Sequence, residues 1–262
     1  MMILKDKVIL ITGVGPGMGQ AMAKLAAQEG ARVALAARKQ AYLDDVAAEI
    51  AAAGGEALAL STDVTDSAQC DALVAATVAR FGRIDGLVNS AYAPGENGPF
   101  ETADVESWAG TIDVACLGAA RMAQAVAPHM KAAGGGAIVN VATMQALKPL
   151  PGGSLSYAIA KGALITVSRQ LAAELGPWNI RVNATRMGWL WGEPVRQALE
   201  SMAAASGTTA EAIAARVAAS IPLRIIPPEE ECARTVLLLL SDYTRMVTGA
   251  VLDVNGGEWM AP

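Results

Sequence analysis

The sequence has little of what many enzyme sites require. It contains a single histidine, His129, and three scattered cysteines with no Cys-x-x-Cys spacing. One histidine argues against a histidine-based catalytic triad and against a histidine-rich metal site, so we expect no bound metal. Cys70, Cys116 and Cys232 are expected to be free thiols in a reducing cytoplasm.

Long apolar runs and a strong charge of one sign are also missing. Runs such as Val236–Leu240 are far shorter than the roughly 20 residues that cross a bilayer, so no membrane partner is expected. The formal net charge of −5 predicts no general attraction to nucleic acid. The first strand-like segment starts close to the N-terminus, which leaves no room for a signal peptide and predicts a cytoplasmic protein.

The sequence is rich instead in short β-branched runs that alternate with alanine-rich helical stretches. Such alternation indicates βαβ crossovers, and hence a parallel sheet with helices on both faces. With 262 residues, 53% of them hydrophobic, the chain can bury one large core. We therefore predict a single α/β domain over residues 1–262, built on a doubly wound parallel sheet of about seven strands.

The expected elements follow from this alternation. The strands are Val8–Thr12, Arg32–Ala36, Ala57–Ser61, Gly86–Asn89, Ala137–Ala142, Ile180–Thr185 and Ala250–Val254. Helices are expected at Ala21–Ala27, Tyr42–Ala53, Ser67–Phe81, Val105–Met130, Leu155–Leu175 and Glu229–Leu240. Residues 187–228 break the rhythm with extra helical segments between two strands. Because this region follows the C-terminal end of a strand, we predict that it is a substrate-binding lid.

A glycine-rich turn, TGVGPGMG at Thr12–Gly19, joins the first strand to the first helix. A glycine-rich run alone often makes only a turn. Strand, tight glycine turn and helix in this order form the context that a dinucleotide-binding motif requires. The free N–H groups and the partial positive charge of the helix N-terminus suit a pyrophosphate.

Tyr157 and Lys161 are four residues apart, so on a helix both side chains leave from one face. A phenol has a pKa of about 10, and a nearby lysine cation is expected to lower it toward neutral pH. Such a pair also occurs on many helices by chance. Together with the glycine turn, however, the pair indicates hydride transfer, with the tyrosine handling the proton.

These motifs, with several others in the same order, resemble the short-chain dehydrogenase/reductase family over essentially the whole chain. The matching segments are Thr12–Gly19, Asp63–Val64, Asn89–Tyr92, Tyr157–Lys161, Ile180–Asn183, Thr248–Gly249 and Asp253–Gly257. The resemblance implies a Rossmann-type fold and an NAD(P)-dependent oxidoreductase that interconverts a ketone and a secondary alcohol. It also implies a homotetramer, with a homodimer as the alternative.

The resemblance assigns roles to three catalytic residues. Tyr157 would be the general acid in reduction or the base in oxidation, and Lys161 would lower its pKa and bind the nicotinamide ribose. Thr143 stands where the family has a catalytic serine, although its spacing to Tyr157 is one residue longer than expected. Ser154 and Ser156 are the alternatives to Thr143.

The resemblance also implies a set of residues that bind the cofactor. They are Thr12, Gly13, Gly15, Gly17, Met18, Gly19, Arg38, Asp63, Val64, Asn89, Ala91, Tyr157, Lys161 and Gly188. Ala37 stands where an NAD-preferring member would carry Asp, and Arg38 can pair with a 2′-phosphate. We therefore predict NADP(H). NAD(H) is the alternative, because the glycine turn lacks a second basic residue.

Three departures from the family pattern concern the site. Ala115 replaces an asparagine that holds a relay water, which predicts a slower enzyme rather than an inactive one. Met187–Gly188 replaces the usual Pro-Gly pair. Gly192 stands where a threonine often holds the carboxamide of the nicotinamide, so that contact is expected to come from backbone or lid groups.

The expected substrate pocket is mostly apolar. Its predicted substrate-binding residues are Tyr92, Met144, Leu150, Trp189 and Trp191. They favour a hydrophobic, cyclic or aromatic ketone, although aromatic residues near a lid could equally be core. The other hypotheses are a 3-oxoacyl thioester reductase, a non-redox lyase or isomerase on this fold, and a non-catalytic nucleotide-binding protein.

Overall fold

The computed structural model describes residues 2–150 and 152–261. Its centre is a seven-stranded, all-parallel sheet with the strand order β3-β2-β1-β4-β5-β6-β7, which confirms the doubly wound prediction. The strands are β1 Val8–Thr12, β2 Arg32–Ala37, β3 Glu56–Ser61, β4 Gly86–Asn89, β5 Gly136–Thr143, β6 Ile180–Met187 and β7 Val251–Val254. Each predicted strand is present, and its ends are shifted by at most two residues.

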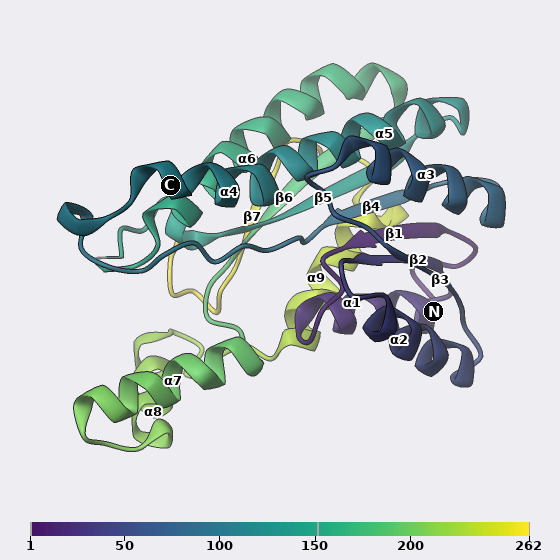
Figure 1. Cartoon of the computed structure of the whole chain (residues 1–262). Coiled ribbons are helices and arrows are strands. Elements are labelled where there is room, and N and C mark those ends of the chain that lie inside the picture. The colour runs from purple at the N-terminus through teal and green to yellow at the C-terminus, as the bar shows by residue number, and fades with distance from the viewer. Residues whose placement is uncertain (1, 151, 262) are drawn as a thin grey trace.

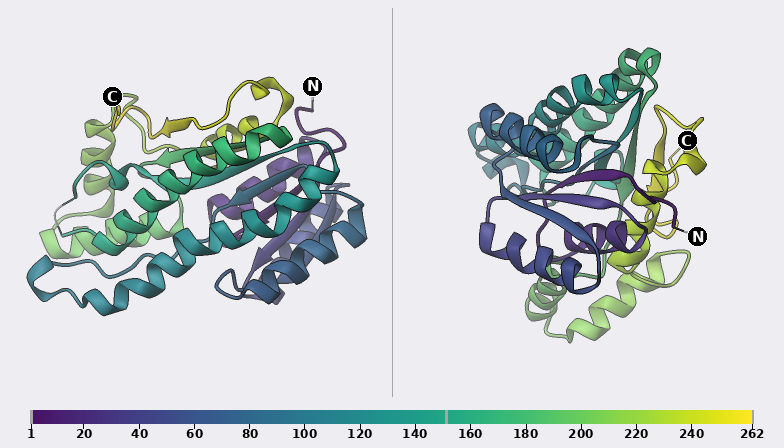
Figure 2. Two further views of the ribbon diagram at one scale, coloured as in Figure 1. Left: turned by 90° about the horizontal axis from the view of Figure 1, so that it is seen from above. Right: turned by 90° about the vertical axis from the view of Figure 1, so that its right-hand side faces the viewer.

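Helices cover both faces of the sheet, as Figures 1 and 2 show. On one face lie α1 Met18–Gln28, α2 Gln40–Ala52 and α9 Glu229–Leu240. On the other lie α3 Ser67–Phe81, α4 Trp108–Ile112, α5 Gly118–Ala132 and α6 Leu155–Leu175. Along β1, Ile9 and Ile11 enter one core while Leu10 enters the other. A strand buried on both sides needs this continuous apolar run.

The single helix expected over Val105–Met130 is wrong in detail. A short 3₁₀ turn precedes α4, and a wide π-helical turn, Asp113–Leu117, separates α4 from α5. A π turn inserts an extra residue that apolar periodicity does not reveal, and such turns are frequent at functional sites. Ala115 and Cys116 lie within this turn and are buried.

Residues 187–228 contain α7 Glu193–Ser206 and α8 Ala210–Ser220, which project beyond the sheet in Figure 1. The two helices share a small apolar cluster of their own. It consists of Leu199, Ala203, Ile213, Ile221 and Ile226. This segment therefore packs largely on itself rather than within either main core.

Other expectations can be compared with the described residues. No helix in residues 2–150 and 152–261 is long and apolar enough to cross a membrane. The same residues hold no group of three or more His, Cys, Asp or Glu side chains that could bind a metal ion. Cys70, Cys116 and Cys232 are buried free thiols.

Candidate functional site

Tyr157 and Lys161 lie near the start of α6, where it packs against β5. Ser154 caps this helix, because its Oγ accepts a hydrogen bond from the Tyr157 backbone N–H at 3.3 Å. The buried Lys161 side chain donates from Nζ to the Val141 carbonyl of β5 at 2.7 Å. This Nζ lies 5.9 Å from the centroid of the Tyr157 ring. The fold thus brings the two residues together beside the C-terminal end of β5.

The electrostatics of this pair differ from the expectation. Burial, with a smaller contribution from Tyr92, raises the pKa of the Tyr157 phenol above its ordinary value. Burial also lowers the pKa of Lys161 to about 8. The predicted lowering of the tyrosine pKa is therefore wrong for this geometry, in which the lysine is bonded to Val141. Tyr157 is a neutral phenol at neutral pH, the form that donates a proton.

Thr143 is the last residue of β5, and its side chain is buried. Its Oγ1 donates to the Met187 carbonyl at 3.3 Å and accepts from the Gln145 N–H at 3.3 Å. The alternatives, Ser154 and Ser156, lie 3.2 Å apart between their Oγ atoms at the start of α6. The hydroxyl of Ser154 already serves the helix cap, whereas Thr143 stands at the strand edge where parallel sheets place ligands.

The glycine turn is closed on the side of the sheet at Gly13 and open at Gly15. Gly13 has φ +74°, and a Cβ there would collide with the Ser90 carbonyl at the end of β4. A Cβ at Gly15 would meet no atom within 4 Å. Thr12 Oγ1 accepts from the Ser90 N–H at 3.3 Å and so ties β1 to β4. This cradle at the N-terminus of α1 fits the pyrophosphate of a dinucleotide.

Arg38 and Asp63 follow the neighbouring strands β2 and β3. Hydrogen bonds from Thr65 are the main cause that lowers the pKa of Asp63, and the charge of Arg38 lowers it further. Asp63 Oδ1 accepts from the Thr65 N–H at 2.9 Å and from its Oγ1 at 2.7 Å. Arg38 is exposed and Val64 is buried beneath this edge. The arrangement leaves the Arg38 guanidinium accessible to a phosphate on the adenosine side.

A chain of hydrogen bonds between buried side chains connects the C-terminal end of β4 to α6. Asn89, at the end of β4, donates from Nδ2 to Asn140 Oδ1 at 2.9 Å and to the Ala119 carbonyl at 3.2 Å. Asn140 in turn donates to Ser168 Oγ on α6 at 2.8 Å. Sequence reasoning missed Asn140 and Ser168, although an asparagine inside an apolar strand is a usable signal. Buried polar groups need such partners, and here the bonds fix β4, β5 and α6 to one another.

The predicted substrate-binding residues do not all lie in one environment. The ring of Tyr92 packs edge-on against Tyr157, with centroids 5.4 Å apart and an interplanar angle of 83°. Leu150 and Trp191 are exposed, whereas Met144 is buried. Trp189 packs against the α7–α8 cluster, which favours the alternative of a core residue.

Gly188 follows β6 in a crowded position. A Cβ there would lie 2.8 Å from Asn255 Cβ and 3.4 Å from Met144 Sδ. A side chain at this position would therefore displace the C-terminal segment. Ala91, another predicted cofactor-binding residue, is partly buried and lies two residues after Asn89.

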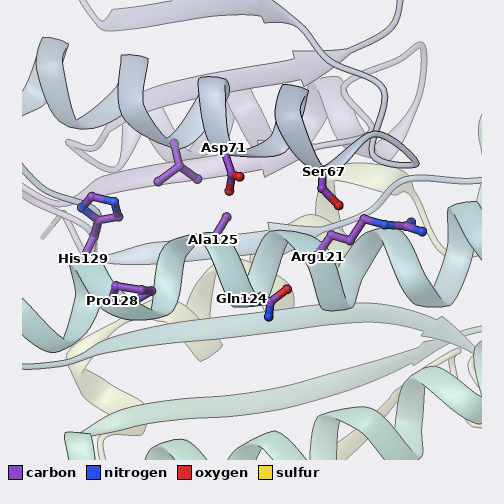
Figure 3. Close-up of a pocket in the computed structure, with 8 residues that line it drawn as sticks. Ser67, Asp71, Arg121, Gln124, Ala125, Pro128 and His129 are labelled. Atoms are coloured by element: carbon purple, nitrogen blue, oxygen red, sulfur yellow. The ribbon is translucent and has the colours of Figure 1, made fainter.

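A separate pocket lies between α3 and α5 (Figure 3) and has a volume of about 410 Å³. It is lined by Ser67, Asp71, Val74, Arg121, Gln124, Ala125, Pro128 and His129. None of the predicted site residues contributes to it. The single histidine therefore lies away from the Tyr157–Lys161 pair.

Known proteins match this chain over nearly its whole length. A family model described as enoyl-(acyl carrier protein) reductase matches residues 13–258. Levodione reductase of Leifsonia aquatica is 32% identical, over 97% of this chain and 94% of its own length. Cis-4-hydroxycyclohexanecarboxylate dehydrogenase of Sinomonas cyclohexanicum is 34% identical over 96% of both chains. The crystal structure of L-sorbose reductase from Gluconobacter frateurii, complexed with NADPH and L-sorbose, has a TM-score of 0.93 at 30% identity, covering 100% of this chain and 99% of its own.

Proposed function

The chain belongs to the short-chain dehydrogenase/reductase family, and from this premise we propose that it reduces an apolar cyclic or aromatic ketone with NADPH. Oxidoreductase chemistry on a carbonyl or alcohol carbon is common to its relatives. The observation that carries the proposal is the placement of Tyr157 beside the buried Lys161, at the sheet edge that also bears the glycine turn.

The nicotinamide, when bound, would supply the hydride. Tyr157 would donate its phenolic proton to the carbonyl oxygen of the substrate. Thr143 would offer a second hydroxyl donor to that oxygen, at the cost of its 3.3 Å bond to the Met187 carbonyl. Lys161 would position the site and assist reprotonation of the tyrosine, since its pKa near 8 lets it exchange a proton close to neutral pH.

The preference for NADPH rests on Arg38. The guanidinium is exposed at the end of β2, and Ala37 before it carries no charge that would repel a 2′-phosphate. Replacing Arg38 with Asp should weaken NADPH binding by about tenfold or more, the value of a charge-assisted hydrogen bond, and favour NADH. An unchanged ratio of NADPH to NADH affinity would contradict this assignment.

An apolar substrate is supported by Tyr92 against Tyr157 and by the exposed Leu150 and Trp191. Residues 187–228 would close over it as a lid. The names of two relatives, a levodione reductase and a cis-4-hydroxycyclohexanecarboxylate dehydrogenase, also point toward ring substrates. A homotetramer is proposed from the open groove between α5 and α6, whose lining includes Leu117, Leu171 and Leu175.

The test is a substrate panel with purified protein, NADPH or NADH, and nicotinamide absorbance as the readout. Cyclic ketones should oxidise NADPH faster than charged acyl thioesters do. The opposite order would favour a 3-oxoacyl thioester reductase and contradict the proposed substrate class. Turnover of no carbonyl compound, with either nicotinamide, would contradict the redox function itself.

A further inference from the structure

Glu229, the first residue of α9, places its carboxylate against the glycine turn. The backbone N–H of Met18, at the start of α1, lies close enough to lower the pKa of this carboxylate. A Cβ on Gly17 would lie 2.7 Å from Glu229 Oε1. The carboxylate therefore lies at the helix end where this fold holds a pyrophosphate.

A third element closes on the same carboxylate. A Cβ on Gly192, the residue before α7, would collide with the carboxylate of Glu229. Gly192 has φ −145°, an extended conformation that any residue adopts. The contact with Glu229, rather than the backbone, therefore requires glycine at this position. The carboxylate joins the cofactor turn, the start of the lid segment and α9.

Such a carboxylate opposes a dinucleotide. The positive end of α1 attracts any anion, but one N–H cannot serve two acceptors well, and two anions at one helix end repel each other. Burial and Glu230 raise the pKa of Glu229, while the charge of Arg196 on α7 lowers it. The charge of Glu229 in turn contributes to the raised pKa values of Tyr42 on α2 and Cys232 on α9. Because the net effect is a raised pKa, keeping the Glu229 carboxylate charged at this position costs free energy. The carboxylate can therefore be displaced.

We propose that the Glu229 carboxylate occupies the glycine turn and competes with the pyrophosphate for the N-terminus of α1. This competition weakens dinucleotide binding and speeds dissociation of the dinucleotide. This inference rests on the proposed function, because it needs the turn to bind a nicotinamide dinucleotide. Displacement would leave Glu229 free to turn toward Arg196, and would release the start of the lid segment from the turn.

The test is a titration of the full chain with NADPH, followed by tryptophan fluorescence, for wild type, Glu229→Gln and Glu229→Ala. Glu229→Gln keeps the shape and removes the charge, so NADPH should bind about tenfold tighter and dissociate more slowly. Glu230→Gln is the matched control: this exposed neighbour should leave the affinity within about twofold. Thermal unfolding without cofactor shows whether each variant is folded.

Gly192→Ala tests the same inference without removing a charge. The added methyl group should push the Glu229 carboxylate out of the turn and tighten NADPH binding, but have no effect in a Glu229→Ala background. Equal effects of Gly192→Ala in both backgrounds, or an affinity of Glu229→Gln that is unchanged or weaker, would overturn the inference. Failure of folded wild type to bind either dinucleotide would instead contradict the proposed function.

Discussion

The β5–α6 region and the α7–α8 segment are built in opposite ways. In the first, buried polar groups are bonded to neighbouring elements, as Lys161 is to Val141 and Asn140 to Ser168. In the second, two helices pack on a small apolar cluster of their own and project from the molecule in Figure 1. A segment with few contacts to the main core can move at low cost. We infer that the chemistry lies in the first region and substrate selection in the second.

The largest expected effect is on turnover and comes from a substitution in the β5–α6 region. Tyr157→Phe removes only the hydroxyl, so turnover should fall by about 10²- to 10⁴-fold while NADPH still binds. Steady-state kinetics and a binding titration on the same preparation measure both quantities. Turnover at the wild-type rate would show that the proton comes from elsewhere.

Thr143→Val keeps the shape of the side chain and deletes the donor. Turnover should fall by about 10²-fold, as on loss of one donor to a reacting oxygen, and Thr143→Ser should keep most of it. Ser154→Ala is the control, and it should affect stability through the lost cap of α6 more than turnover. If Ser154→Ala lost turnover and Thr143→Val kept it, Ser154 rather than Thr143 would be the second donor.

Lys161→Met tests the burial of the β5–α6 region through stability. The folded-state pKa of about 8 lies below the ordinary value of 10.5. From pH 8 to 10.5 the unfolded chain therefore binds more protons than the folded one, and the stability contributed at this site rises with pH. Relative to Lys161→Met, wild type should gain about 3 kcal/mol across this window.

Urea unfolding of both proteins at pH 7 and near pH 10 measures that difference. A difference in unfolding free energy that does not change with pH would mean that Lys161 titrates at its ordinary pKa. The lysine would then not be held in a dehydrated environment.

The smallest expected effect belongs to residues 187–228, which contain α7 and α8. Trp191 is 42% exposed, and its backbone N–H donates to the Pro227 carbonyl at 2.8 Å, a bond that substitution leaves in place. Trp191→Ala should raise KM for an apolar ketone about fivefold, near 1 kcal/mol, without changing kcat. A fall in kcat with KM unchanged would place this residue with the chemistry and remove the contrast between the regions.

The sequence was sufficient for the parts of the fold that depend on local pattern. Apolar periodicity placed each strand, and the order of the motifs identified the family. The assigned roles of Tyr157, Lys161 and Thr143 remain predictions for the experiments above. The wide turn at Asp113–Leu117 was missed because one extra residue in a helix leaves the apolar pattern almost intact.

The remaining errors and omissions concern contacts between distant segments. Spacing places Lys161 beside Tyr157 but does not show that Val141 takes its hydrogen bond or that burial raises the tyrosine pKa. The contact of Glu229 with the glycine turn joins α9 to α1, which lie far apart in the sequence. Desolvation and such long-range contacts are set by tertiary packing, which a single sequence does not display.

A crystal structure of the chain with NADPH is the most direct test of the account. We predict the pyrophosphate at the N-terminus of α1, the 2′-phosphate at Arg38 and the nicotinamide beside Tyr157, with the Glu229 carboxylate moved out of the turn. A dinucleotide bound elsewhere, for example in the pocket between α3 and α5, would contradict the assigned site and the chemistry derived from it.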